Sequence, residues 1–515
     1  MQKVTSGKEA VSIIKNGDTV AILGNGGGIL EPKLVFEEIE RSFLDNGYPR
    51  DLTVIHSAGI GDKKAEGLNR FAHEKMVKRV IGGHWGWSPK MQKLAVDNKI
   101  EAYNLPQGAI VLNYRELAAK RPGLITKIGL KTFVDPDVNG GKLNDVTKED
   151  IVEKINIGGE DWLRYKTMPI DVAVIRGTTA DLNGNITFEE EPVFLEAFAL
   201  AQAAYNSGGK VICQVKYLAS NDTLNPKDIK IPGFMIDKVV VDNNQSQTSE
   251  DNFDPSLSGQ IKKPISSITP LELNNRKIIA RRAAMELEDY TVINLGFGMP
   301  DGVSNVANEE GIIDKLTFTL EQGIVGGVPA GGDIFGVAYN ANMILDAPSQ
   351  FDFYSGHGLD LTCLGLAQVD KKGDVNVSKF GSTISGCGGF IDISQTSKKC
   401  IFCGTFTAGG LETEISDGKL SIVKEGRHKK FVDDVEHITF SGQYASETKQ
   451  EVLYVTERAV FTIKDGKLEL IEIAPGVDLE KDILENMEFK PEISDNLKLM
   501  DERIFKDEKM NIKES

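Results

Sequence analysis

Two halves of this 515-residue chain repeat one order of elements, and this duplication restricts the folds open to it. Residues 19–26 (T-V-A-I-L-G-N-G) and 291–298 (T-V-I-N-L-G-F-G) each follow an expected helix and have the pattern of a buried strand ending in a glycine turn. A second strand pattern comes later in each half, at 52–56 and 316–320, and Gly-Ile follows soon after both. Helix, strand, glycine turn, helix and strand in this order predict an α/β fold with largely parallel sheets.

A shorter repeat pairs residues 181–186 (D-L-N-G-N-I) with 370–375 (D-K-K-G-D-V). Because the chain is also too long for a single core, we expect two similar open α/β domains produced by the internal duplication. The predicted organisation is an N-terminal domain at 1–242, a linker at 243–264, a C-terminal domain at 265–490 and a charged tail at 491–515. The linker is expected from its few core-forming residues, and the tail is expected to fray from residue 501 onwards.

A single carboxylate, Glu321, stands at the end of the expected strand 316–320, ahead of a glycine-rich segment at 323–332. Open α/β sheets bind their ligands beyond the carboxyl ends of the strands, where a carboxylate can act as nucleophile, acid/base or anchor. In the duplicated alignment Glu321 falls on Ser57, so only the second half carries the carboxylate. This asymmetry favours chemistry at Glu321, against the alternatives of a surface glutamate at a strand end and of simple drift.

Three further segments are candidates for ligand contacts. Residues 294–300 (N-L-G-F-G-M-P) predict a turn from strand to helix with Pro300 as the first helical residue, and exposed N–H groups there favour an oxyanion or a phosphate. Residues 386–390 (G-C-G-G-F) hold three glycines in four positions, and Gln107 in 104–108 (N-L-P-Q-G) offers amide donors to a carboxylate. The alternatives are plain structural turns and, for Gln107, a solvated loop.

Composition excludes several classes of function. The formal charge of −17 argues against non-specific binding to nucleic acid and to anionic membranes, and no apolar run is long enough to span a membrane. Five scattered cysteines and a start unlike a secretory signal favour the cytoplasm, and C-x-x-C at 400–403 fits buried strand cysteines. The six histidines lack ligand spacing, so no metal is expected.

Taken together, the strings T-L-E-Q-G-I-V-G-G-V-P-A-G-G, N-L-G-F-G-M-P, L-P-Q-G and G-C-G-G-F resemble family I coenzyme A transferases. The likeness is strongest to single-chain propionate/acetate CoA-transferases of bacteria, and it runs from about residue 17 to about residue 472. G-G-H-W at 82–85 and F-C-G-T-F-T-A-G-G at 402–410 match as well. At 356–358 (G-H-G) the relatives' pattern carries a third glycine in place of His357, which puts the substrate range in question.

The resemblance implies ping-pong exchange of CoA between short-chain acyl-CoA and short-chain carboxylates such as acetate, propionate, butyrate and acetoacetate. It implies Glu321 as the nucleophile that forms a glutamyl-CoA thioester, with Gln107 binding the substrate carboxylate from the other half, at a site between domains. It implies oxyanion donors at Gly388, Gly389, Gly298 and Met299, and CoA contacts at Asn294, Gly296, Asn376 and Lys399. Coenzyme A is then a substrate and no further cofactor is needed. A homo-oligomer is expected.

Three other functions remain open at this point. A thioesterase would use the same glutamate with water as acceptor. A sugar-phosphate isomerase or ligand sensor of the same broad fold would not need Glu321 together with the glycine pair at 388–389. A scaffolding protein is disfavoured because the chain shows no long heptads and no repeats beyond two.

Overall fold

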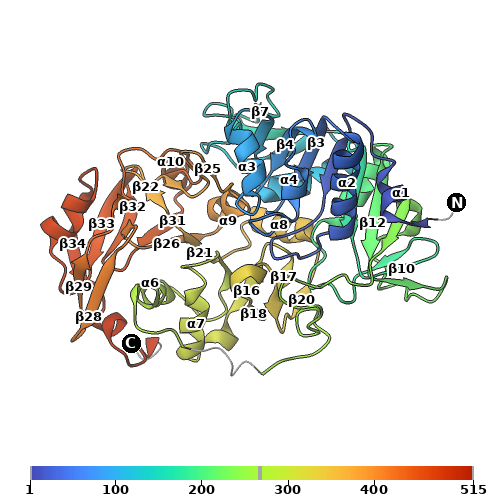
Figure 1. Ribbon diagram of the computed structural model, residues 1–515. Coiled ribbons are helices and arrows are strands. Elements are labelled where there is room, and N and C mark those ends of the chain that lie inside the picture. Colours follow the sequence, from blue (N-terminus) through green and yellow to red (C-terminus); the bar gives the residue numbers. More distant parts are fainter. Residues whose placement is uncertain (1–2, 265–269, 513–515) are drawn as a thin grey trace. The chain divides into compact units, whose positions relative to one another are not determined.

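The computed structural model describes residues 3–264 and 270–512, and within it the chain forms two compact units. Each unit draws on three stretches of the sequence (Figure 1). Unit 1 comprises Met1–Lys263, Leu320–Asp352 and Ser382–Asp392, and unit 2 comprises Pro264–Thr319, Phe353–Gly381 and Ile393–Ser515. This division differs from the predicted domains, because the segment that begins with Leu320 and carries Glu321 groups with the N-terminal part of the chain.

Unit 1 is built on an eight-stranded sheet in which every neighbouring pair is parallel. In spatial order its strands are β1 (Val4–Thr5), β14 (Lys238–Val241), β12 (Lys210–Val215), β9 (Val172–Arg176), β2 (Thr19–Ile22), β3 (Leu52–His56), β4 (Val77–Gly82) and β5 (Glu101–Asn104). The helices are α1 (Gly7–Val11), α2 (Lys33–Asn46), α3 (Pro89–Val96), α4 (Gln107–Ala118) and α5 (Ala197–Asn206). Strands buried on both faces explain the continuous apolar runs in the sequence.

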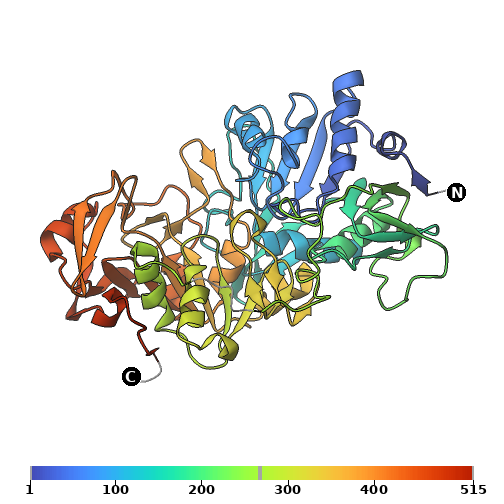
Figure 2. The same cartoon turned by 60° about the horizontal axis from the view of Figure 1, so that its bottom comes forward.

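Alternate residues of these strands face different helices. Val54 and Val80 belong to a hydrophobic core that also contains Phe36 of α2 and Met91 of α3, and Figure 2 shows α2 running beside the blue strands. Ile55 and Ile81, one residue further along each strand, line a cavity with α4 instead. The sheet therefore carries helices on both faces, as expected for an open α/β fold.

Smaller sheets complete unit 1. They are β6 (Gly123–Thr126), β7 (Val152–Ile157) and β8 (Glu160–Lys166); β10 (Thr179–Asp181), β11 (Ile186–Thr187) and β13 (Tyr217–Ala219); and β18 (Val328–Pro329) with β19 (Ala338–Tyr339). The strands β17 (Ile324–Val325) and β20 (Met343–Ile344), which pair antiparallel, also belong to unit 1. The helix α8 spans Ala347–Ser355 and α9 spans Phe390–Thr396.

The sheet of unit 2 is parallel between its first five strands, antiparallel in the next two pairs and parallel again in its last pair. In spatial order its strands are β16 (Thr317–Leu320), β15 (Val292–Leu295), β21 (Leu361–Gly365), β26 (Lys399–Cys403), β31 (Glu451–Val455), β32 (Ala459–Lys464), β33 (Lys467–Ile473) and β34 (Glu492–Leu499). The helices α6 (Asn275–Ala284), α7 (Gly302–Glu309) and α10 (Gly442–Thr448) belong to it. So do the short strands β22 (Gln368–Val369), β23 (Val375–Asn376), β27 (Thr407–Ala408), β28 (Glu412–Ser416), β29 (Lys419–Lys424) and β30 (His428–Lys429).

The predicted α/β fold with largely parallel sheets is confirmed, and one repeated turn shows how closely the halves agree. Gly184 and Gly373 each have a positive φ and each donate from N–H to the carbonyl of the turn's first aspartate at 2.9 Å. The side chains of those aspartates, Asp181 and Asp370, then accept a backbone N–H four residues on, at 2.9 and 3.1 Å. The same four-residue spacing therefore builds the same turn in both halves.

Two segments expected to be loose are packed. In the predicted linker, Gln245 and Gln247 are buried, and their side-chain amides donate to the carbonyls of Gly177 (2.8 Å) and Glu190 (2.6 Å). In the predicted tail, Ile504 and Phe505 are buried in the core of unit 2. The few core-forming residues of the linker and the charges of the tail gave no sign of these contacts. Because Ile504 and Phe505 are buried, the segment from 501 to 512 is packed rather than frayed. Residues 1–2, 265–269 and 513–515 of the predicted segments lie outside the described residues.

Within the part of the chain that the structure describes, no helix combines the length and the apolar character needed to cross a membrane.

Candidate active site

Glu321 follows β16 directly and is half-buried in a tight turn. Gly323 in that turn has φ +102°, and a Cβ there would lie 2.1 Å from the carbonyl oxygen of Leu345, so only glycine fits. The neighbouring Gln322 is buried and donates from Nε2 to Oδ1 of Asn25 at 3.3 Å. The turn that carries Glu321 is therefore held within unit 1 by packing on both sides.

Gln107 is the first residue of α4 and is 3% exposed, which excludes the solvated loop as its setting. Its backbone N–H donates to the carbonyl of Gly388 at 2.8 Å. Its side-chain Nε2 is buried and has no hydrogen-bond partner among the described residues. A buried amide donor left without a partner is unfavourable unless a ligand satisfies it.

The glycine segment 386–389 packs against the turn that follows β4. The N–H of Gly388 donates to the carbonyl of Gly83 at 2.8 Å, and the N–H of Trp85 donates to the carbonyl of Ser385 at 2.7 Å. Gly386 has φ +78°, and a Cβ there would come within 2.9 Å of the Gly83 carbonyl oxygen. Of the two amides of this segment that were expected to serve an oxyanion, those of Gly388 and Gly389, the first is already engaged with the Gly83 carbonyl.

His84 completes this group. A Cβ placed on Gly388 would lie 3.6 Å from Cδ2 of His84 and 3.8 Å from Oε1 of Gln107, so the three residues adjoin. Burial, with smaller contributions from His56 and Lys63, lowers the pKa of His84 to about 4. Its Nδ1 accepts the N–H of Gly86 at 3.2 Å, which leaves the proton of the neutral ring on Nε2.

Sequence reasoning missed His84, Asn104 and Asp392 as members of this group. Asn104 donates from Nδ2 to the carbonyls of Gly82 (2.8 Å) and Gly83 (2.6 Å) and accepts the N–H of Cys387 at 3.0 Å. Its side chain thus ties together the turn after β4 and the glycine segment 386–389. The sequence could have indicated Asn104 as a site residue because it directly precedes L-P-Q-G.

Asp392 is 1% exposed, and its Oδ2 accepts the N–H of Gly108 at 3.1 Å. Burial raises its pKa to about 8, backbone N–H groups oppose the rise, and the charge of Glu321 adds to it. Glu321, Gln107, Gly388 and Asp392 therefore belong to one neighbourhood of unit 1. The signal in the sequence was a lone carboxylate inside the apolar run F-I-D-I.

The candidates for CoA contacts lie in unit 2. Asn294 in β15 is buried and donates from Nδ2 to the carbonyl of Thr319 at 3.1 Å, while its Oδ1 has no partner among the described residues. The N–H of Gly296 donates to the carbonyl of Cys363 at 2.8 Å. Gly298 has φ +89°, and its N–H donates to Oδ2 of Asp301 at 3.3 Å. The helix α7 begins at Gly302, two residues later than Pro300, because a turn through Met299 precedes it.

Asn376 and Lys399 have strong contacts of their own. Asn376 is fully buried, donating to Gln368 Oε1 and the Lys379 carbonyl at 2.7 Å each. Lys399 Nζ lies 2.6 Å from a carboxylate oxygen of Glu286 and 3.4 Å from one of Glu451. A CoA phosphate at Lys399 would have to compete with both carboxylates.

His357 is exposed and adopts φ +61°, the left-handed region in which the relatives' glycine would be unstrained. Its Nδ1 lies 2.9 Å from the carbonyl oxygen of Thr396. These observations place His357 on the surface of unit 2.

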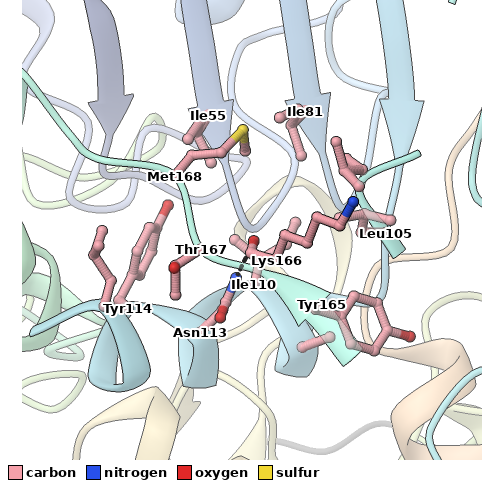
Figure 3. A pocket seen from close by; sticks show the side chains of 13 residues that line it. Ile55, Ile81, Leu105, Ile110, Asn113, Tyr114, Tyr165, Lys166, Thr167 and Met168 are labelled. Carbon is pink, nitrogen blue, oxygen red and sulfur yellow. Dashed lines mark hydrogen bonds between the residues drawn. The ribbon is translucent and has the colours of Figure 1, made fainter. Parts of the chain in front are cut away.

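A cavity of about 30 Å³ lies between α4 and the strands of unit 1 (Figure 3). Ile55 and Ile81 reach it from β3 and β4, Ile110 and Tyr114 from α4, and Met168 from the segment after β8. The hydroxyl of Tyr114 is buried without a partner among the described residues. The volume suits about one water molecule, so this is a small void in a packed core.

The neighbourhood of Glu321 combines a carboxylate with buried amide donors, which suits nucleophilic attack on a carbonyl and binding of a second carboxylate. Among residues 3–264 and 270–512, no group of three or more His, Cys, Asp or Glu side chains is arranged to hold a metal ion.

Comparison with known proteins agrees with this geometry. A sequence model of the family described as coenzyme A transferase matches residues 4–242. The chain is 49% identical to acetate CoA-transferase YdiF of Escherichia coli O157:H7, over 98% of this chain and 96% of that protein. It is also 49% identical to caffeate CoA-transferase of Acetobacterium woodii, over 98% of both chains.

Solved structures show the same relationship. The crystal structure of the YdiF acyl-CoA transferase apoenzyme from E. coli O157:H7 superposes with a TM-score of 0.95 at 48% identity, covering 99% of this chain and 97% of that one. The thioester complex of the same enzyme with CoA gives a TM-score of 0.94 over the same shares of both chains. With near-complete coverage at this identity, the chain belongs to the coenzyme A transferase family and is a CoA-transferase.

Proposed function

We propose that this enzyme moves CoA between short-chain acyl-CoA and short-chain carboxylates, with Glu321 as the nucleophile. The observation that carries the proposal is the neighbourhood of Glu321 in unit 1. It holds a half-buried carboxylate, a buried side-chain amide of Gln107 that has no partner in the described part of the chain, and the glycine segment 386–389. A relative at 48% identity forms a thioester complex with CoA, which supports a covalent CoA intermediate.

The proposed reaction needs neither a cofactor nor a metal. The Glu321 carboxylate attacks the thioester carbonyl, and the C–S bond breaks to give a mixed anhydride and CoA thiolate. The thiolate attacks the glutamyl carbonyl, releasing the first carboxylate and leaving CoA on Glu321 as a thioester. A second carboxylate then reverses both steps and departs as the new acyl-CoA.

In this proposal each acyl carboxylate is held by the side-chain amide of Gln107. The amides of Gly389 and Met299 serve the oxyanions directly, whereas those of Gly388 and Gly298 do so by exchanging their present acceptors. Removing one donor to such a charge typically lowers the rate by ~10²–10³. Asn294 contacts CoA where β15 ends, and Gly296, Asn376 and Lys399 are the less favoured contacts because their donors are already bonded.

Acetate and propionate are the proposed acceptors, with butyrate and acetoacetate as further substrates. The relatives named for acetate and for caffeate differ widely in the size of the acid, so substrate range is a separate property of each member. We also propose a homo-oligomer in the cytoplasm, a compartment that suits five buried thiols without a disulfide.

The decisive experiment is to trap CoA on Glu321. Purified enzyme incubated with acetyl-CoA and then borohydride should be reduced at Glu321, because a thioester is reducible and a carboxylate is not. Glu321→Gln should lose at least ~10³-fold in rate, since an uncharged amide is a poor nucleophile. Glu288→Gln, at an exposed glutamate near β15, is the matched control and should keep wild-type activity.

The same preparation separates transfer from hydrolysis. Acetyl-CoA without an acceptor acid should be consumed very slowly, and added propionate should restore turnover with parallel double-reciprocal lines. Continuing CoA release without any acceptor would establish a thioesterase. An unmodified Glu321 in active protein would falsify the covalent mechanism.

A further inference from the structure

We propose that Asp392 is a positioning residue of the transfer site, whose buried carboxylic acid fixes the first turn of α4 and therefore the side chain of Gln107. This inference rests on the proposed function, in which Gln107 binds the acyl carboxylate. Asp392 stands two residues after the G-C-G-G-F string and 284 residues from Gly108 of the helix that it contacts.

Two consecutive amides of α4 bind one short segment of unit 1. The N–H of Gln107 donates to the carbonyl of Gly388 at 2.8 Å, and the N–H of Gly108 donates to Oδ2 of Asp392 at 3.1 Å. The first N–H groups of a helix have no partner inside the helix, so these two bonds satisfy donors that otherwise need water. Together they form a clamp that sets where α4 begins.

The clamp requires glycine at position 108 of L-P-Q-G. A Cβ at Gly108 would lie 2.3 Å from Oδ1 of Asp392 and 2.5 Å from Cδ1 of Phe351. Any side chain there would push the carboxyl away, since real Cβ atoms do not approach oxygen so closely. Because Gly108 has no side chain, the carboxyl of Asp392 can reach its backbone N–H. This contact fixes the position of the neighbouring Gln107.

Burial is the main cause of the raised pKa of Asp392, and the groups that face it modify that pKa. Glu321 is an electrostatic neighbour that opposes its ionisation. The phenol of Tyr165 in β8 and the thiol of Cys387 interact with it as well, and burial raises the pKa of both. From α4 it meets the backbone amides of Gly108 and Ala109, and Phe351 of α8 adds only an apolar ring.

With its pKa raised to about 8, Asp392 is mostly neutral at pH 7. A neutral acid accepts the Gly108 N–H without placing a second negative charge beside Glu321. Above pH 8 it becomes a carboxylate, which repels both Glu321 and the incoming acid anion. The clamp thus combines two tasks: it aligns Gln107 and it keeps the pocket for an anion free of extra negative charge.

The test compares Asp392→Ala with Asp392→Asn. Alanine leaves the Gly108 N–H without its acceptor, and a displacement of about 1 Å at a binding group can lower a rate by ~10²-fold. Asp392→Ala should therefore raise KM for acetate by about 10-fold or more, while the inhibition constant of free CoA stays within about threefold. Asparagine keeps a neutral acceptor, so Asp392→Asn should stay within about threefold of wild type at pH 7.

The pH profile distinguishes positioning from general support of the fold. Wild-type kcat/KM for acetate should fall above pH 8, and Asp392→Asn should lack that fall. Glu31→Gln is the matched control: Glu31 is a buried carboxyl of unit 1 that accepts the Gly61 N–H at 2.8 Å, and burial raises its pKa to about 7. This control should keep the wild-type alkaline limb.

Hydrogen exchange gives a readout that does not depend on transfer activity. Amides of a peptide covering 107–112 should exchange faster in Asp392→Ala than in wild type. An unchanged KM and unchanged exchange in folded Asp392→Ala would overturn the proposal, as would an alkaline limb retained in Asp392→Asn. If Asp392→Ala does not fold, the Asp392→Asn profile decides. If wild type transfers no CoA, the proposed function fails while the exchange result still tests the clamp.

Discussion

At the scale of single residues, the two halves of the duplication differ most informatively where Ser57 and Glu321 occupy matching positions. The Ser57 hydroxyl donates to the buried carboxyl of Glu196, whose pKa is raised to about 7 by burial. Glu321 instead stands half-buried in a glycine turn. The first half therefore keeps its acid inside the protein at this point, whereas the second half leaves its acid half-buried.

A residue-scale prediction concerns the unpartnered amide of Gln107. Gln107→Ala should raise KM for acetate while leaving the inhibition constant of free CoA nearly unchanged, because the lost contact serves only the carboxylate. The loss of one such polar contact corresponds to ~1–3 kcal/mol, or about 5- to 150-fold in KM. Steady-state kinetics over a panel of acids measures it. Unchanged KM with every acid would remove Gln107 from the site.

Residues of this kind differ in how far the sequence reveals them. Glu321 and Gln107 stand out by residue type, one at the end of a predicted strand ahead of a glycine-rich segment and the other in L-P-Q-G, although a surface glutamate and a solvated glutamine were open alternatives. Asp392 acquires its meaning only from the approach of Gly108 across 284 residues, which no local pattern records. The engagement of Asn376 and Lys399 by their neighbours is likewise a property of the folded chain.

At the scale of elements, α6 and the C-terminal segment of unit 2 depend on each other. Arg281 of α6 is fully buried and donates to the carbonyls of Ile504 (3.2 Å) and Glu508 (2.9 Å), and it pairs with Glu309 of α7 at 3.2 Å. The tail was expected to fray because of the charges between 501 and 515. The apolar residues spaced among those charges are what pack it. Strand periodicity in the duplicated halves was far easier to read, because it recurs.

The matching prediction is that Arg281→Ala lowers the free energy of unfolding by about 3–5 kcal/mol, because buried carbonyls and Glu309 lose a charged donor. Urea unfolding followed by circular dichroism measures the change. Arg41→Ala removes an exposed arginine paired with Glu37 and Glu38, and should stay within about 1 kcal/mol of wild type. Equal effects of the two substitutions on the free energy of unfolding would contradict a stabilising role for the buried contacts of Arg281.

At the scale of the whole molecule, buried acids link stability to pH. Burial raises the pKa of Glu31 and Glu196 to about 7 and that of Asp392 to about 8. Because the unfolded chain releases these protons near pH 4, the folded state binds more protons between about pH 4 and 8. The free energy of unfolding should therefore fall as pH rises through this window, on the order of 1 kcal/mol or more per acid. Urea unfolding at pH 6 and pH 8.5 measures this fall in the free energy of unfolding. The fall should be smaller in Glu31→Gln than in wild type, and an equal fall in both proteins would contradict the prediction.

The division of the chain into interleaved stretches has a consequence for biosynthesis. Unit 1 takes its last stretch from Ser382–Asp392 of a 515-residue chain, after both earlier stretches of unit 2 have been made. A ribosome releases the chain from its N-terminus onwards, so the eight parallel strands emerge long before the segments that carry Glu321 and Asp392. During that interval the backbone N–H groups of Gln107 and Gly108 lack their acceptors, Gly388 and Asp392, which have not yet been translated. A nascent chain arrested before residue 382 should therefore show the sheet of unit 1 protected from proteolysis and the start of α4 still open to it.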